Sequence, residues 1–174
     1  MPRNIEIKAR VTDLNIIADR LKALHIKKSA VIRQADIFFE NPQGRLKLRR
    51  FSDHSGELIF YQRSDLKGPK TSIYDIYRTT DPAGLEKILR LAYPVLGEVE
   101  KTRDLYLTGP TRIHLDRVAG LGNFLELEVV MENGQPAEAG EQIARDLIRK
   151  LGVNPEDCLE GAYIDLLTGS SATD

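Results

Sequence analysis

Two glutamates, Glu126 and Glu128, lie one residue apart in a stretch that alternates acidic and aliphatic residues. In a β-strand, residues two apart point to the same face, so these carboxylates project side by side. They repel each other unless a cation lies between them. Hard oxygen ligands favour Mg²⁺ or Mn²⁺, which bind through a few carboxylates and phosphate oxygens. The sequence therefore predicts a metal site, with Glu6 as third ligand and Asp116 as a further ligand or a residue behind the ligands.

Basic residues follow the same two-residue spacing elsewhere in the chain, and they too alternate with aliphatic residues. Each such stretch presents charge on one face of a strand and aliphatic side chains on the other. The charged positions are Glu6 and Lys8, then Arg45, Lys47 and Arg49, then Lys101 and Arg103, then Arg112, His114 and Asp116. Two roles are open for His114, a pair with Asp116, which is the plainer one, and a catalytic role.

The charged faces belong either outside a barrel, in water, or inside it. Three predicted amphipathic helices need an apolar surface to cover, and the outer face of a barrel would provide it. We therefore expect the aliphatic faces to point outward under the helices and the charged faces to point inward. An eight-stranded barrel normally fills its centre with side chains, so a charged centre requires acids, ions or a ligand as partners.

Such an interior is interpreted as a binding site because it is costly for stability. At an effective dielectric constant near 20, two unit charges about 4 Å apart interact by roughly 4 kcal/mol, so clustered cations without anions repel one another on that scale. The expected ligand is elongated and highly anionic. A polyphosphate fits, since Arg offers planar bidentate donors and Lys a compact point charge.

The elements that must position these residues follow from apolar spacing and turn signals. Strands are expected at Arg3 to Arg10, Ala30 to Phe39, Arg45 to Phe51, Glu57 to Arg63, Thr71 to Arg78, Glu98 to Leu107, Arg112 to Val118 and Phe124 to Met131. Helices are expected at Thr12 to Ile26, Asp81 to Ala92, Glu138 to Leu151 and Gly161 to Leu167. The second helix is expected to bury Leu85, Ile88, Leu89 and either Leu91 or Ala92. The hairpin-like connections predict a mostly antiparallel α+β fold whose sheet can close into a barrel.

The composition is that of a globular protein, with 174 residues, 41% hydrophobic and 29% charged, and a net charge of −1. Balanced charge gives no global positive field, so nucleic acid is not an expected partner. Apolar runs are shorter than the roughly 20 residues of a membrane helix, and the N-terminus lacks the apolar core of a secretion signal. Cys158 stands alone, which excludes an internal disulfide. We expect a cytoplasmic protein with no membrane partner.

The ordered set of charged motifs resembles the CYTH superfamily, also called triphosphate tunnel metalloenzymes, over about residues 3–167. Glu6 and Lys8 resemble the end of the family's Glu-x-Glu-x-Lys signature, and Gln34-Ala35-Asp36 resembles its second-strand motif. The later motifs in the family's order are Lys47 and Arg49, Lys101 and Arg103, Arg112, and Glu126 with Glu128. The resemblance implies an eight-stranded antiparallel tunnel with helices outside, which binds a triphosphate and a divalent metal ion. We expect one such domain over residues 1–168 and a disordered tail at 169–174.

Roles follow for individual residues. The cations expected to cradle phosphate oxygens are Lys8, Lys47, Arg49, Arg63, Lys101, Arg103 and Arg112. Glu6, Glu126 and Glu128 are expected to hold Mg²⁺ or Mn²⁺, with Asp116 as a further ligand. The carboxylate of Asp36 is expected to order a neighbouring Arg rather than contact the ligand.

Two positions depart from the family pattern or leave a choice open. Asn4 occupies the place of the signature's first Glu, and it leaves the number and affinity of metal ions open. Near the end of its strand, Arg63 is the candidate for an inward cation, with Gln62 as the alternative.

Family members include class IV adenylate cyclases, thiamine triphosphatases and inorganic triphosphatases, and this chain looks closest to bacterial class IV adenylate cyclase (CyaB-like) proteins. The first expectation is therefore cyclisation of ATP to cAMP and pyrophosphate. The alternative is a triphosphatase acting on inorganic, nucleoside or thiamine triphosphate. A third hypothesis, kept open by Asn4, is a non-catalytic polyphosphate-binding domain. Family members are often dimeric, so a homodimer is also left open.

Overall fold

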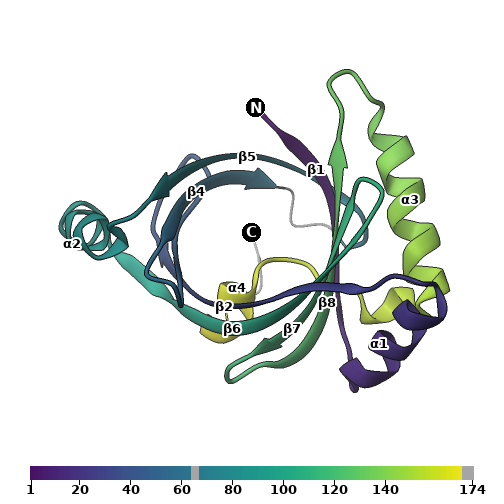
Figure 1. The fold of residues 1–174 in the computed structure, drawn as a ribbon. Helices are drawn as coiled ribbons and strands as arrows, with labels where there is room; N and C mark the ends of the chain where they lie inside the picture. The colour runs from purple at the N-terminus through teal and green to yellow at the C-terminus, as the bar shows by residue number, and fades with distance from the viewer. Residues whose placement is uncertain (64–66, 170–174) are drawn as a thin grey trace.

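A closed barrel forms the centre of the molecule (Figure 1). The computed structural model describes residues 1–63 and 67–169, and within them eight strands follow the order β1-β5-β4-β3-β2-β6-β7-β8 around the barrel. Every neighbouring pair is antiparallel. The strands are β1 Arg3–Arg10, β2 Lys28–Phe39, β3 Arg45–Phe51, β4 Gly56–Arg63, β5 Lys70–Thr79, β6 Val95–Thr108, β7 Thr111–Val118 and β8 Gly122–Met131. The predicted antiparallel α+β barrel is confirmed.

Strand register carries the charged residues to the inside. β1 and β8 pair so that Glu6 faces Glu128 and Lys8 faces Glu126, and these side chains line the interior. The alternate residues of β1, such as Ile7, point the other way and are buried beneath helices. The prediction that aliphatic faces point outward under the helices is therefore confirmed for this part of the barrel.

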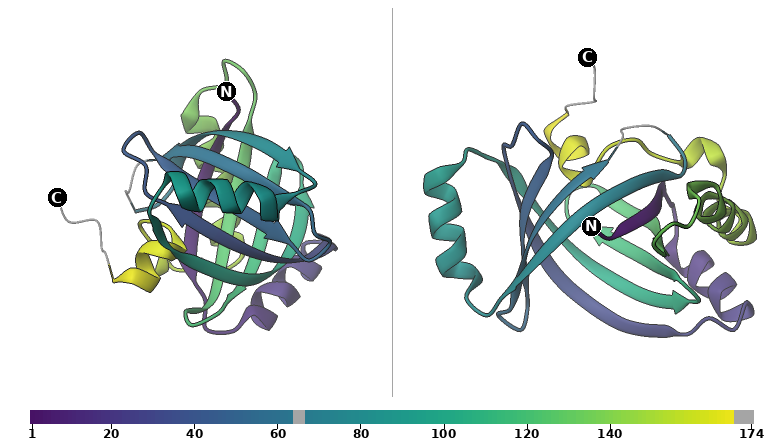
Figure 2. Two further views of the ribbon diagram at one scale, coloured as in Figure 1. Left: turned by 90° about the vertical axis from the view of Figure 1, so that its left-hand side faces the viewer. Right: turned by 90° about the horizontal axis from the view of Figure 1, so that it is seen from above.

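Two helices cover the outer face of β1, β7 and β8. α1, Leu14–Ala23, and α3, Ala137–Lys150, lie side by side against this wall in Figures 1 and 2. Their buried residues join those of the strands in one apolar cluster, which includes Leu21 and Ala144 at 0% exposure. Burial of aliphatic side chains at about 25 cal/mol per Å² makes this helix–sheet layer a main source of stability.

The bounds of α1 are narrower than predicted, for local reasons. Asp13 caps the helix, since its carboxylate accepts a hydrogen bond from the backbone N–H of Asn15 at 2.8 Å. At the other end His25 adopts φ 58°, in the left-handed region that continues no helix. The helix therefore ends before Ile26.

α2, Pro82–Ala92, lies on the opposite side of the barrel (Figures 1 and 2). Asp81 caps it, as predicted, by accepting from the backbone N–H of Gly84. Leu89 is buried against Leu48 of β3 and its neighbours. The predicted burial of Ile88, and of either Leu91 or Ala92, is wrong, because only one narrow face of this helix contacts the sheet. Ile88 and Leu91 are 64% and 82% exposed, and Ala92 is exposed as well.

The C-terminal segment returns to the barrel. A 3₁₀ turn, Pro155–Asp157, leads to α4, Tyr163–Thr168, which lies near one end of the barrel (Figure 2). α4 packs with Phe38 and Phe124 in an apolar cluster, and Asp165 pairs with Arg45 at 2.7 Å. Of the tail predicted at 169–174, residues 170–174 lie outside the described residues.

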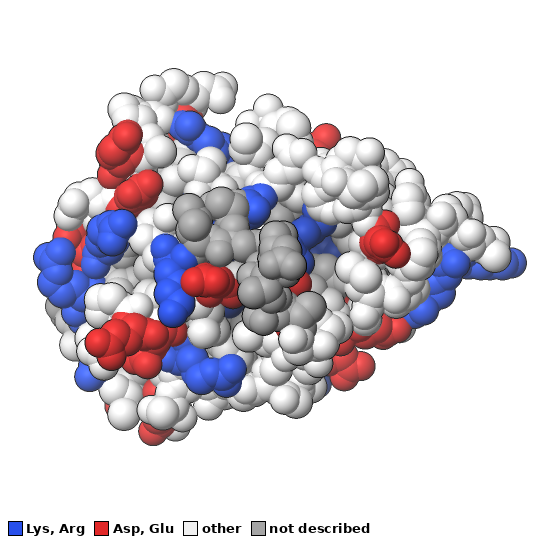
Figure 3. All heavy atoms as spheres, turned by 180° about the vertical axis from the view of Figure 1, so that it is seen from behind, with Lys and Arg blue, Asp and Glu red and all other residues white. Residues whose placement is uncertain are grey.

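The surface mixes the two signs of charge. On the face seen in Figure 3, Lys and Arg side chains lie among Asp and Glu side chains. Among the helices of the described residues, none combines the length and the hydropathy that a membrane span requires.

Candidate active site

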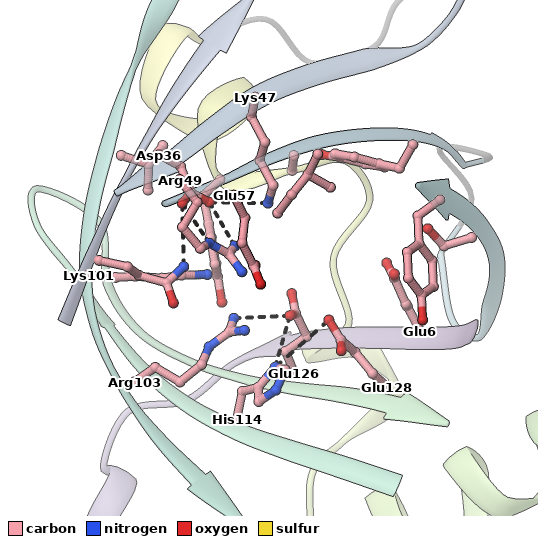
Figure 4. Close-up of a pocket in the computed structure, with 18 of the residues that line it drawn as sticks. Glu6, Asp36, Lys47, Arg49, Glu57, Lys101, Arg103, His114, Glu126 and Glu128 are labelled. Atoms are coloured by element: carbon pink, nitrogen blue, oxygen red, sulfur yellow. Dashed lines mark hydrogen bonds and ion pairs between the residues drawn. The ribbon is translucent and has the colours of Figure 1, made fainter. Parts of the chain in front are cut away.

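The inward faces of the strands enclose a cavity of about 320 Å³ (Figure 4). Most of the residues that the sequence nominated line it, namely Glu6, Lys8, Lys47, Arg49, Arg63, Lys101, Arg103, Arg112, Glu126 and Glu128. Asp116 is fully buried behind this lining. The barrel therefore brings together cations and acids from strands far apart in the sequence.

Asp36 holds two of the cations on one wall. Its carboxylate accepts from Nε and Nη2 of Arg49 at 2.8 and 2.9 Å, in bidentate geometry, and lies 3.1 Å from Nζ of Lys47. Burial alone would raise the pKa of Asp36, but Arg49 and Lys47 hold it well below its usual value. The prediction that Asp36 orders a neighbouring Arg is confirmed.

Asp116 plays the same part on the adjacent wall. It accepts from Nε and Nη2 of Arg103, both at 2.7 Å, from Nζ of Lys101 at 3.2 Å and from the hydroxyl of Tyr163 at 2.9 Å. Its oxygens are thus surrounded by donors, which suits a residue that positions cations better than a metal ligand. Burial, together with nearby Arg103, lowers the pKa of Lys101 to about 7.

Glu126 is the centre of the acidic part of the cavity. It lies 3.0 Å from Nζ of Lys8, 3.1 Å from Nη2 of Arg103 and 3.2 Å from Nδ1 of His114. Burial would raise its pKa, but Lys8 and Arg103 hold the pKa of Glu126 well below its usual value. This carboxylate is therefore ionised at neutral pH.

His114 contacts a different acid from the one expected. The sequence pairs it with Asp116, which lies two residues along the same strand. The register of β7 and β8 instead places His114 opposite Glu126, and cross-strand neighbours are closer than residues i and i+2. The predicted pair with Asp116 is wrong. Burial, with Arg103 nearby, lowers the pKa of His114, so the ring is neutral at pH 7.

Glu6 and Arg63 form an ion pair beside the acidic group, by which we mean Glu126, Glu128 and His114. Nη1 of Arg63 lies 3.1 Å from Oε2 of Glu6, and the Arg63 side chain is 4% exposed. Its Nε and Nη2 have no hydrogen-bond partner among the described residues. Gln62, the alternative candidate, points away and donates to the backbone oxygen of Gln43. Burial and the charge of Glu128 raise the pKa of Glu6.

Arg112 links the acidic group to β1 and β5. Its Nε donates to Glu128 at 2.9 Å. With the Asn4 amide oriented so that its oxygen faces the guanidinium, that oxygen accepts from Nη2 of Arg112 at 3.0 Å. Tyr74 also hydrogen-bonds Arg112. The amide oxygen of Asn4 therefore already has a hydrogen-bond donor, the guanidinium of Arg112.

Two tyrosines that hydrogen-bond the charged residues of this cavity are absent from the residues that the sequence predicts for the site. Tyr74 and Tyr163 both line the interior, where Tyr74 bonds to Arg112 and Tyr163 to Asp116. Tyr74 lies two residues after Ser72 on β5, and both line the cavity. The two-residue spacing along this strand could therefore have predicted that Tyr74 points inward. Tyr163 gave no such signal, because its place depends on how α4 returns to the barrel.

The donor set suits a hard divalent cation. One ligand atom from each of His114, Glu126 and Glu128 lies within 4.8 Å of the others, and Figure 4 shows the three side chains facing the wall of Asp36 and Arg49. Glu6, on the strand next to Glu128, adds a carboxylate to the same cavity. Carboxylates with room for phosphate oxygens are ligands that Mg²⁺ or Mn²⁺ accepts.

Comparison with known proteins agrees with this geometry. Residues 2–163 match the profile of the CYTH domain. The chain belongs to the CYTH domain family. A curated relative named Adenylate cyclase CyaB, from Aeromonas hydrophila, is 25% identical over 158 residues, which are 86% of this chain and 81% of that protein.

Solved structures share the barrel of this CYTH domain. The PH1012 protein from Pyrococcus horikoshii OT3 superposes with a TM-score of 0.85 at 29% identity, covering 94% of this chain and 98% of the other. The Hippeastrum protein HpAC1, described as having a dominant triphosphatase activity, superposes with a TM-score of 0.69 at 14% identity, covering 98% and 96%. The predicted family and fold are confirmed.

Proposed function

We propose that this CYTH domain is a metal-dependent enzyme that binds a triphosphate inside its barrel and cleaves it. The observation that carries the proposal is Arg63. Its guanidinium is buried, lines the cavity beside Glu6, and has two nitrogens without a hydrogen-bond partner among the described residues. A buried donor without an acceptor costs about 1–3 kcal/mol, and an anionic ligand would remove that cost.

The phosphate oxygens are bound by cations that stand on several walls. Lys47 and Arg49 come from β3, and Lys101 and Arg103 come from β6. Asp36 and Asp116 hold these four groups in place from behind, so little side-chain conformational freedom is lost when a ligand binds. The remaining members of the phosphate cradle are Lys8, Arg63 and Arg112.

Glu6, Glu126 and Glu128 would hold Mg²⁺ or Mn²⁺, and the bound ion would offset the negative charge that develops on the phosphate in the transition state. The carboxylates are in turn oriented by their cations, Arg63 for Glu6, Lys8 for Glu126 and Arg112 for Glu128. Asp116, enclosed by donors, acts as a positioning residue in this scheme.

The first candidate reaction is cyclisation of ATP. The 3′-hydroxyl oxygen of the ribose attacks the α-phosphorus, the bond from that phosphorus to its bridging oxygen breaks, and pyrophosphate leaves. The hydroxyl proton passes to solvent. The cations of β3 and β6 stabilise the charge that collects on the leaving pyrophosphate. The name of the Aeromonas relative supports this candidate.

The second candidate is hydrolysis, in which water attacks the γ-phosphorus and the bond from that phosphorus to its bridging oxygen breaks. The diphosphate part leaves with the bridging oxygen, the γ-phosphoryl group becomes orthophosphate, and the proton of the water passes to solvent. The cavity volume of about 320 Å³ favours hydrolysis, since this is at the lower end of the roughly 300–1,000 Å³ of small-molecule sites. An inorganic triphosphate would need no further room. A nucleoside would have to lie at the mouth.

Product analysis tests the proposal. Purified protein is incubated with ATP or tripolyphosphate and with Mg²⁺ or Mn²⁺. Formation of cAMP with pyrophosphate identifies the cyclase, and release of orthophosphate identifies the hydrolase. Arg49→Ala and Arg103→Ala should weaken triphosphate binding in calorimetry, whereas Arg145→Ala on the surface of α3 is the matched control.

Two results would contradict the proposal. Tight tripolyphosphate binding without turnover of any triphosphate leaves a polyphosphate-binding domain. Unchanged affinity in the folded Arg49 and Arg103 variants would remove the tunnel as the binding site.

A further inference from the structure

His114 is a buried imidazole of the acidic group that the proposed phosphate cradle does not use. Its Nδ1 lies 3.2 Å from Oε1 of Glu126 and 4.0 Å from Oε1 of Glu128, and its side chain is 4% exposed. Ligands about 2.1 Å from an octahedral ion are about 3 Å apart when adjacent and about 4.2 Å apart when opposite. One ligand atom from each of the three side chains lies within 4.8 Å of the others, so small side-chain movements would bring all three to one ion.

Strand geometry fixes this arrangement. His114 on β7 pairs directly with Glu126 on β8, and Glu128 follows two residues later on the same face. The imidazole thus projects from a rigid strand into the space beside both carboxylates (Figure 4). Side chains placed by two paired strands keep their mutual distance better than side chains on loops.

Of the other polar groups near the two glutamates, Glu6 is oriented by Arg63 as a carboxylate ligand, and the amide oxygen of Asn4 accepts from Arg112. Glu126 already forms ion pairs with Lys8 and Arg103, so its negative charge is balanced without the imidazole. The nitrogen of His114 is therefore the donor best placed to join Glu126 and Glu128.

We propose that His114 is a metal ligand, and that with Glu126 and Glu128 it forms a mixed nitrogen and oxygen site that selects Mn²⁺ over Mg²⁺. The inference rests on the proposed function, since it concerns the ion that accompanies the triphosphate. Mg²⁺ is bound in proteins almost exclusively through oxygen ligands, whereas Mn²⁺, a first-row transition-metal ion, also accepts an imidazole nitrogen. Phosphate oxygens and Glu6 would supply further ligands.

Electron spin-echo envelope modulation of Mn²⁺ bound to the full chain, without nucleotide, tests this directly. Directly bound imidazole gives a ¹⁴N modulation, and labelling histidine with ¹⁵N changes it. We expect the modulation in the wild-type protein and in His54→Asn, which alters an exposed loop histidine. We expect it to disappear in His114→Asn. Mn²⁺ affinity should fall by about tenfold or more in that variant, with little change for Mg²⁺.

The outcomes separate this inference from the proposed function. Mn²⁺ that binds through Glu128, as judged by its loss in Glu128→Gln, but shows no ¹⁴N modulation would overturn the inference. So would the absence of Mn²⁺ binding. Triphosphate turnover in the same preparation then decides the function independently. Modulation without turnover of any triphosphate would retain the metal site and reject the enzyme.

Discussion

Nζ of Lys8 on β1 lies 3.0 Å from Oε2 of Glu126 on β8, and the two residues are direct register partners. Both are buried, and Lys8 also lies 3.9 Å from the ring centroid of Tyr163. One strand pair therefore places a cation next to the acid that neutralises it. This local pairing explains how a barrel can hold so many charges in its interior, because a buried charge without a partner is strongly destabilising.

Asp116 should be essential for stability. In Asp116→Asn, Arg103 and Lys101 lose the carboxylate that offsets their buried charge. Removing one partner of a buried pair costs about 3–5 kcal/mol, so we expect a loss of this size in the free energy of unfolding. Urea denaturation measures it. The control is Asp146→Asn on the surface of α3, which should change stability by less than about 0.5 kcal/mol. Equal stability of the two variants would contradict the role given to Asp116.

Lys101 should make triphosphate binding depend on pH. Its pKa is about 7 in the folded protein, below the ordinary value of 10.5, because of burial and Arg103. Between these values the unfolded chain binds more protons, so the contribution of Lys101 to stability rises with pH across that window. A bound triphosphate has the opposite effect on Lys101, because its negative charge favours the protonated ammonium form. Binding at pH 8 should therefore take up a proton.

Calorimetry in buffers of different ionisation enthalpy measures this uptake. We expect a clear uptake with tripolyphosphate in the wild-type protein and a smaller one in Lys101→Arg, because arginine stays charged at pH 8. Protonation of tripolyphosphate itself is common to both proteins and cancels in the difference. Identical uptake in both would show that Lys101 does not change its charge.

Arg63 should contribute to affinity. Its two nitrogens without partners among the described residues would gain phosphate oxygens as acceptors. A hydrogen bond to a charged group is worth about 1.5–3 kcal/mol, so Arg63→Met should weaken tripolyphosphate binding about 10- to 100-fold. Arg149→Met, on the exposed face of α3, serves as the control. Unaltered affinity in a folded Arg63→Met protein would remove Arg63 from the phosphate site.

Much of the barrel could be predicted because side chains alternate along strands. The two-residue spacing in Glu126 and Glu128, or in Lys47 and Arg49, is visible in the chain and survives folding. The need of amphipathic helices for an apolar surface then fixed which face points inward. Alternation along each strand and the amphipathic helices were therefore sufficient to predict which side chains line the barrel.

The pairing of the charges could not be predicted in the same way. Whether His114 meets Asp116 or Glu126 depends on strand register, which is set by turns and by packing of the opposite face. Tyr163 reaches Asp116 only because a C-terminal helix returns to the barrel. The exposure of Leu91 likewise depends on how narrowly α2 contacts the sheet.

Asn4 offers a final prediction, because it is where this chain departs from the family signature. It is 3% exposed, lies two residues before Glu6 on the same face, and accepts from Arg112. In Asn4→Glu the new carboxylate would attract Arg112 away from Glu128. Glu128 would then be free to bind the metal ion. One added interaction of about 1.4 kcal/mol raises affinity tenfold, so we expect Mg²⁺ to bind about ten times more tightly by calorimetry. Asn15→Glu on α1 adds the same charge on the outside of the barrel and should leave Mg²⁺ affinity unchanged. Equal Mg²⁺ affinity in the two variants would show that position 4 does not influence the ion.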